Sequence, residues 1–124
     1  MMLDWNEYQK QLQSRIGEIG RSSPEIVRGY RALSEAGAKT ARLDAKVREL
    51  IAVAVAHVTQ CPYCIRGHTK AALRHGATPE EIMEAIWVAA EMRAGGAYAH
   101  SAIALDTIAY VKGEKHELRW DQHD

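Results

Sequence analysis

The stretch that decides the fold runs from residue 44 to residue 76 and reads DAKVRELIAVAVAHVTQCPYCIRGHTKAALRHG. Its first half carries large apolar residues at helical spacing on one face, and small apolar residues on the opposite face. A helix that is apolar on two faces is buried on both, so we expect residues 44–59 to form the central helix of the domain. The same pattern hints that subunits pack together.

The remaining helices are marked by capping residues. Asp4 has Glu7 three residues further on, Ser23 precedes Pro24, and Thr78 precedes Pro79 and Glu81. Gly95 and Gly96 are expected to break the chain. The pattern therefore predicts an all-α fold of six helices and no convincing strand, with helices over residues 4–18, 23–37, 44–59, 61–75, 78–94 and 97–111.

These helices are expected to form one compact domain. Within it we distinguish an N-terminal helical hairpin over residues 1–40, a core over residues 41–112, and a polar tail over residues 113–124. The tail, GEKHELRWDQHD, carries no apolar periodicity.

Composition excludes several classes of function. The chain has 124 residues, in which 16 Lys and Arg balance 16 Asp and Glu. Nucleic acid and anionic membranes attract a basic surplus, so neither is expected as a partner. No apolar run approaches the roughly 20 residues of a membrane-spanning helix, and the sequence starts without the pattern of a signal peptide. We therefore expect a cytoplasmic protein.

The residues that carry chemistry lie on one stripe of the helix over residues 61–75. Cys61, Cys64 and His68 are spaced by three and four residues, which places them on the same helical face. A thiol near a helix start is activated by the positive end of the dipole, an imidazole one turn away takes its proton, and a second thiol closes a disulfide. This pattern favours a reactive dithiol.

Two other interpretations stay open from the residues alone. Cys61, Cys64 and His68 supply three zinc ligands, and Glu49 or His57 is an available fourth. The two cysteines could instead be inert packing residues. Glu49 lies among small apolar neighbours, and a buried carboxylate of this kind serves either as a proton shuttle or as a structural hydrogen-bond partner.

In the run from Glu49 to His68, the glutamate lies twelve residues before Cys61 and the histidine lies four residues after Cys64. This run resembles the alkylhydroperoxidase D-like branch of the carboxymuconolactone decarboxylase family. The following HGATPEEI and the closing helix are also similar to that family. The resemblance implies an all-helical fold that assembles into a homotrimer or homohexamer.

For function, the resemblance implies a thiol peroxidase that reduces organic hydroperoxides, with no metal or organic cofactor and with an external thiol or dithiol as reductant. It implies that Cys64 attacks the peroxide, that Cys61 resolves the product as a disulfide, and that Glu49 and His68 relay the proton. The helix dipole alone favours Cys61 as the reactive thiol. One departure is Tyr63, which stands where the best-known members have a histidine, and a phenol is a poor base at neutral pH.

The sequence leaves two alternative functions besides the peroxidase. The first is a lactone decarboxylase, whose dicarboxylate-like substrate requires a convergent Arg or His pocket. The sequence indicates only scattered arginines, Arg66, Arg74 and Arg93. The second is a non-enzymatic oligomer that senses redox state or binds a metal.

Overall fold

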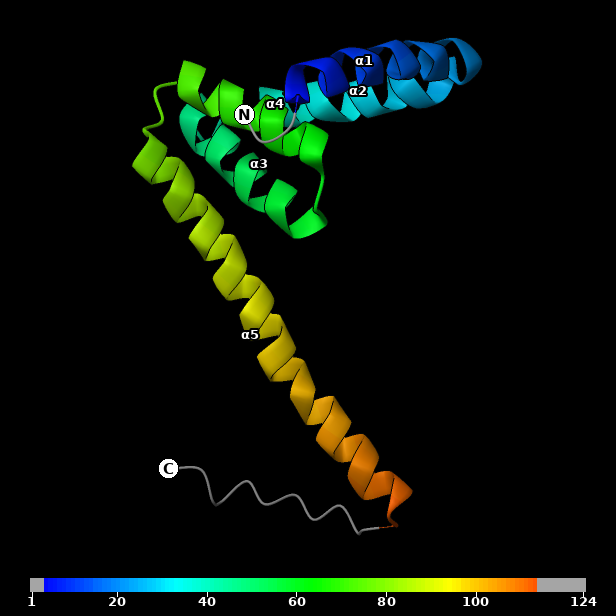
Figure 1. The fold of residues 1–124 in the computed structure, drawn as a ribbon, viewed down its shortest axis with the longest axis vertical. Coiled ribbons are helices and arrows are strands. Elements are labelled where there is room, and N and C mark those ends of the chain that lie inside the picture. The colour runs from blue at the N-terminus through cyan, green and yellow to red at the C-terminus, as the bar shows by residue number, and fades with distance from the viewer. Residues whose placement is uncertain (1–3, 114–124) are drawn as a thin grey trace.

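The structure, a computed structural model, describes residues 4–113 of the chain. It contains five helices in the order α1 (Trp5–Ser22), α2 (Pro24–Lys39), α3 (Ala45–Thr59), α4 (Pro62–Arg74) and α5 (Pro79–Val111), as Figure 1 shows. No strand occurs between residues 4 and 113. The predicted all-α class is therefore confirmed.

The predicted number of six helices is wrong, because Gly95 and Gly96 do not break the chain. Residues 79–111 form a single helix of 33 residues that runs through both glycines. A glycine inside a helix costs only about 1 kcal/mol relative to alanine, and the alanine-rich segments on both sides favour the helix strongly enough to exceed that cost. A β-carbon added at either glycine would meet no atom within 4 Å in this chain.

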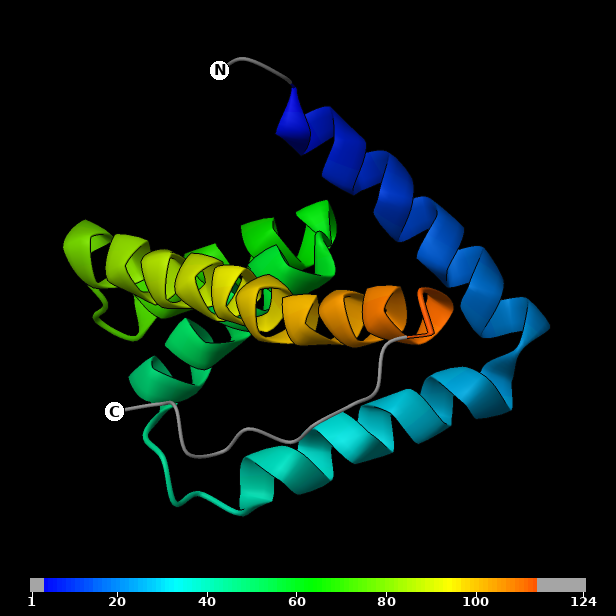
Figure 2. The same cartoon turned by 90° about the horizontal axis from the view of Figure 1, so that it is seen from below.

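The first two helices are longer than predicted and contribute no residue to the buried core. α1 continues through Gly20 to Ser22, and α2 continues through Gly37 to Lys39. From the turn at Ser23 the two helices diverge as an open V (Figure 2). Neither contains a buried residue. Apart from Gly113, the predicted polar tail lies outside the residues that the structure describes.

The core lies where α3, α4 and the first half of α5 meet. Its buried members are Val53, Ala72, Ala77 and Ile82, with Leu50 and Ile86 packed against them. Val53 and Ala72 have no exposed surface. Five of the seven buried residues of the chain's described part are alanines, so α3 and α4 can approach closely, and this approach determines the geometry of the candidate site.

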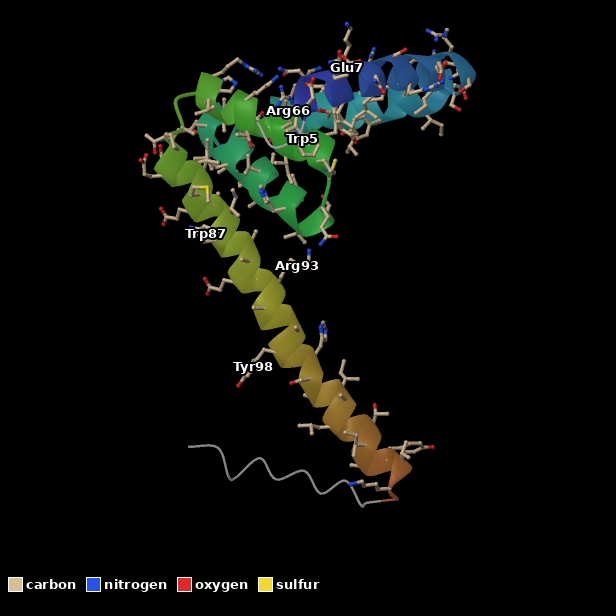
Figure 3. All side chains as sticks on the ribbon, viewed as in Figure 1. Trp5, Glu7, Arg66, Trp87, Arg93 and Tyr98 are labelled. Atoms are coloured by element: carbon tan, nitrogen blue, oxygen red, sulfur yellow. The ribbon has the colours of Figure 1, made fainter. Side chains whose placement is uncertain are left out.

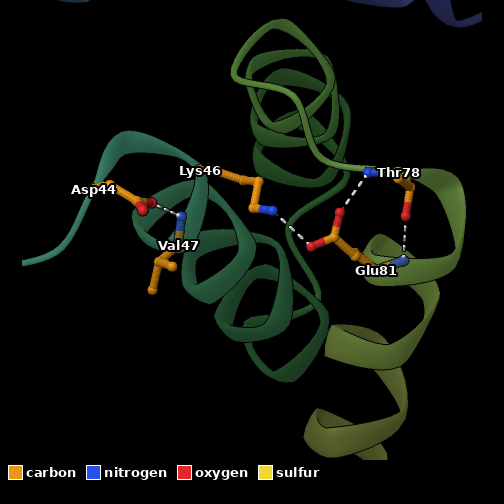
Figure 4. A network of polar contacts seen from close by, with 5 residues as sticks. All are labelled: Asp44, Lys46, Val47, Thr78 and Glu81. Carbon is orange, nitrogen blue, oxygen red and sulfur yellow. Dashed lines mark hydrogen bonds and ion pairs between the residues drawn. The ribbon is translucent and has the colours of Figure 1, made fainter.

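A polar network fixes the starts of α3 and α5 relative to one another (Figure 4). Asp44 caps α3 by accepting the Val47 N–H at 2.9 Å, and Thr78 and Glu81 form a reciprocal capping box on α5. Lys46 Nζ lies 2.8 Å from Glu81 Oε2, so one carboxylate both caps α5 and pairs with α3. The hydrogen bond and charge of Glu81 raise the pKa of Lys46, and the same interactions lower the pKa of Glu81.

The second half of α5 projects away from the other helices (Figure 1). Among the hydrogen bonds between helices of residues 4–113, the one furthest along α5 is donated by Arg93 Nη1 to the Val58 carbonyl at 3.0 Å. Beyond it the large apolar side chains are exposed, namely Tyr98, Ile103, Leu105, Ile108, Tyr110 and Val111. None of the helices within residues 4–113 is long and apolar enough to cross a membrane.

Candidate active site at the start of α4

The turn between α3 and α4 places Cys61 at the N-terminus of α4. Gln60 ends α3 in the left-handed conformation, with φ of 57°, and the Cys61 N–H donates to the Ala56 carbonyl at 3.1 Å. This reversal makes Cys61 the N-cap residue and Pro62 the first residue of α4, where a proline is well tolerated because no N–H partner is needed. The local sequence therefore fixes the position of the first thiol.

The two cysteines are in contact. Both are free thiols and both are partly exposed. The Cys61 sulfur takes the place of an N-cap oxygen and accepts the backbone N–H of Cys64 at 3.2 Å. This N–H and the positive end of the α4 dipole both stabilise negative charge on the Cys61 sulfur.

Cys64 is in the opposite electrostatic situation. Its hydrogen bond with the Cys61 side chain, followed by burial and by the charge of Cys61, raises the pKa of Cys64 to about 11. The thiol of Cys64 is therefore protonated at neutral pH. To act as a nucleophile it must give up its proton to a base.

Glu49 and His68 form a direct pair between α3 and α4. The distance from His68 Nδ1 to Glu49 Oε2 is 2.7 Å. An ionised carboxylate only accepts hydrogen bonds, so Nδ1 carries the proton and Nε2 of the neutral ring is left as a proton acceptor. Glu49 thus orients the ring and stabilises the imidazolium that forms when Nε2 takes a proton.

The expectation that Glu49 is buried is not met within the single chain. Its side chain is 24% exposed, and that of His68 is 45% exposed. The carboxylate is held by its histidine partner at an accessible surface.

The four predicted site residues thus form two pairs. Cys61 contacts Cys64, and Glu49 contacts His68. No hydrogen bond joins His68 to either sulfur in the described part of the chain. The two pairs are neighbours because Cys64 and His68 lie one turn apart on α4. Tyr63, between the cysteines, is exposed.

The structure does not favour a zinc site at this position. Among residues 4–113, no three His, Cys, Asp or Glu side chains gather in a way that could hold a metal ion. His57, considered as a fourth ligand, lies with Nδ1 2.7 Å from the Val53 carbonyl of its own helix.

Of the three arginines that the sequence indicates as scattered, Arg66 lines a cleft of about 640 Å³ together with His57 and Lys70, whereas Arg74 and Arg93 do not line it. Sequence spacing offered one signal for this group, because residues 66 and 70 lie one turn apart on α4. The contribution of α3 could come only from the packing of the two helices.

Comparison with known proteins identifies the family. The model of the carboxymuconolactone decarboxylase family matches residues 24–107. A relative from Paracoccus denitrificans, an uncharacterized protein of the cox locus, is 55% identical over 98 residues, which cover 79% of this chain and 88% of the relative. An uncharacterized protein of Haemophilus influenzae is 39% identical over 112 residues, covering 90% of this chain and 99% of that protein.

A solved structure agrees with this assignment. The crystal structure of an apo carboxymuconolactone decarboxylase family protein from Legionella pneumophila has a TM-score of 0.65 and 33% identity, and the match covers 82% of this chain and 90% of that one. The chain belongs to the carboxymuconolactone decarboxylase family. The predicted resemblance is confirmed for the family, and the alkylhydroperoxidase D-like branch is consistent with it.

The contrast between the two thiols predicts their order of alkylation. We expect iodoacetamide at pH 7 to 8 to modify Cys61 while Cys64 stays unmodified, because the pKa of Cys64 is raised to about 11. In the Cys61→Ser protein the serine retains the helix cap but the neighbouring sulfur is lost, so the pKa of Cys64 falls and Cys64 is alkylated at lower pH than in the wild type. Mass spectrometry of peptides across a pH series measures both. Equal modification of the two thiols at pH 7 would contradict this assignment.

Proposed function

We propose that the protein is a thiol peroxidase that reduces organic hydroperoxides through a dithiol–disulfide cycle of Cys61 and Cys64. The observation that carries the proposal is the 2.7 Å pair of His68 and Glu49, which provides an oriented base one helical turn from a protonated thiol. A second thiol that already contacts the first supports a cycle that ends in a disulfide. Family membership is compatible with this activity.

In the first step Cys64 gives its proton to His68 Nε2, and the resulting thiolate attacks the terminal oxygen of the hydroperoxide. The O–O bond breaks, the sulfur is oxidised to a sulfenic acid, and the alkoxide leaves as an alcohol after it takes the proton back from the imidazolium. Glu49 stabilises that imidazolium through Nδ1. Because the pKa of Cys64 is raised, this base is required at neutral pH.

In the second step the Cys61 sulfur attacks the sulfur of the sulfenic acid. An S–S bond forms, and the hydroxyl leaves as water after it takes up a proton. Cys61 suits this role because the helix N-terminus and the Cys64 N–H stabilise its thiolate. An external thiol or dithiol then supplies two electrons and two protons to restore the reduced pair, which suits a reducing compartment such as the cytoplasm.

We further propose that the chain works as a homo-oligomer, a trimer or hexamer. The support is the second half of α5, whose exposed apolar residues lie on all sides of the helix and are not covered by any other helix within residues 4–113. A helix that is apolar all round is stable in water when other surfaces cover it.

The roles of the two cysteines can be tested by substitution. We expect Cys64→Ser to abolish turnover of cumene hydroperoxide, and Cys61→Ser to stop after one equivalent with a sulfenic acid on Cys64, because no resolving thiol remains. Dimedone trapping and mass spectrometry locate the oxidised sulfur. A sulfenic acid on Cys61 would reverse the two roles, and turnover retained by Cys64→Ser would reject the proposal. Carboxymuconolactone, assayed in parallel, is expected to remain unconverted.

The proton relay can be tested with a matched pair of glutamates. Glu49→Gln keeps the shape of the side chain but removes the charge that stabilises the imidazolium, so we expect peroxide turnover to fall by roughly 10²-fold. Glu81→Gln makes the same change in the capping box of α5, where glutamine still accepts the cap hydrogen bond, and should leave turnover within about twofold. Steady-state rates of hydroperoxide reduction, measured at equal enzyme concentration, compare the two variants. Equal effects of the two substitutions would remove Glu49 from the mechanism.

The assembly can be tested at Leu105, which is 68% exposed in the single chain. Light scattering should give a mass of three or six copies of the 13.8 kDa chain for the wild type and for Leu105→Met, which retains the apolar volume. Leu105→Glu places a charge in the contact and should dissociate or destabilise the assembly. A wild type that elutes with the mass of one chain would contradict the proposal.

A further inference from the structure

A cleft lies between α1, the end of α3 and α4, and neither cysteine is among its lining residues. Its volume is about 640 Å³, which is within the range of roughly 300–1,000 Å³ typical of small-molecule sites. Figure 3 shows Trp5 of α1 and Arg66 of α4 close together at this junction. Segments that lie far apart in the chain therefore form one concave surface.

One part of the lining is apolar. It consists of Trp5, Pro62 and Ile65. Trp5 is held by an edge-to-face contact with Tyr8, in which the ring centroids are 5.6 Å apart and the planes lie at 88°. The cleft thus offers a fixed aromatic wall to an aliphatic or aromatic group.

The other part of the lining is basic. His57, Arg66 and Lys70 line the cleft, and no aspartate or glutamate is among its lining residues. The formal charge of the whole chain is zero, so the lining carries a local excess of positive charge. Within residues 4–113 the ion pairs of the structure involve Arg15, Lys46 and His68, none of which lines it.

The guanidinium of Arg66 is held in place without being neutralised. Its Nε donates to Gln9 Oε1 at 2.7 Å, and Nη2 donates to Asn6 Oδ1. Both acceptors are neutral amides, so they orient the guanidinium plane, and among residues 4–113 no carboxylate pairs with its charge. An anion bound in the cleft would supply that partner.

We propose that this cleft binds a small amphipathic carboxylate, whose anionic head lies at Arg66 and Lys70 and whose apolar tail lies against Trp5 and Ile65. The site lies on the face of α4 formed by residues 62, 65, 66, 69 and 70, whereas Cys64 and His68 lie on another face. The proposal is thus independent of the dithiol cycle. Binding requires no covalent step.

The test uses Trp5 as a reporter within the cleft. Trp87→Phe and Trp120→Phe leave Trp5 as the only one of the three tryptophans. In this full-length background, octanoate should change the Trp5 fluorescence saturably, and its dissociation constant should be at least fivefold lower than that of 1-octanol, which has the same chain but no charge. The difference in affinity between octanoate and 1-octanol should become smaller at high ionic strength, because salt screens the charge of the carboxylate.

Matched variants distinguish the cleft from general hydrophobic binding. Lys70→Gln, at an exposed residue of the lining, should weaken octanoate binding by roughly fivefold, whereas Arg31→Gln, at an exposed arginine of α2 outside the lining, should have no effect. Arg66→Gln should weaken octanoate binding more than Lys70→Gln does. This substitution also loosens α1 from α4, because Arg66 binds side chains of α1.

The proposal would be overturned if octanoate and 1-octanol bound with equal affinity, or if Lys70→Gln and Arg31→Gln had equal effects. Either result would mean that the basic residues of the cleft do not recognise the carboxylate. Cys64→Ser should bind octanoate as the parent does, so that loss of peroxidase activity and loss of binding are separate results.

Discussion

The close packing of α3 against α4 is the constraint on which the rest of the structure depends. Val53 and Ala72 meet with no exposed surface, and the other buried residues between these helices are mostly alanines. Short side chains let the helix axes approach. That approach brings Glu49 of α3 within 2.7 Å of His68 of α4. A larger residue in place of Ala72 would separate the helices and the pair together.

The two faces of α4 offer two different kinds of chemistry. At its N-terminus, one backbone N–H and the helix dipole stabilise a sulfur, while the neighbouring thiol keeps its proton. On another face, the same helix contributes Arg66 and Lys70 to a cleft closed by α1. Because Arg66 also binds side chains of α1, it is both a wall of the cleft and a link that holds the N-terminal helix to the core.

The single chain has a small core and a long exposed helix. α5 uses its first half to bury Ile82 and Ile86 against α3, and its second half has no hydrogen bond to another helix in the described chain. A 33-residue helix of this kind gains little stability from its own hydrogen bonds in water, so much of its stability must come from packing. The proposed assembly would supply this packing.

The sequence by itself determined the helical class, the caps at Asp44 and Thr78, and the alignment of Cys61, Cys64 and His68, because these follow from spacing and local hydrogen bonds within a few residues. It failed at Gly95 and Gly96, where the local cost of glycine is smaller than the helical preference of the residues on either side. Only the tertiary structure decided that Glu49 reaches His68 while remaining partly exposed, and that Arg66 joins His57 and Lys70 around one cleft. Those contacts depend on the distance and rotation between packed helices, which no periodicity along one helix encodes.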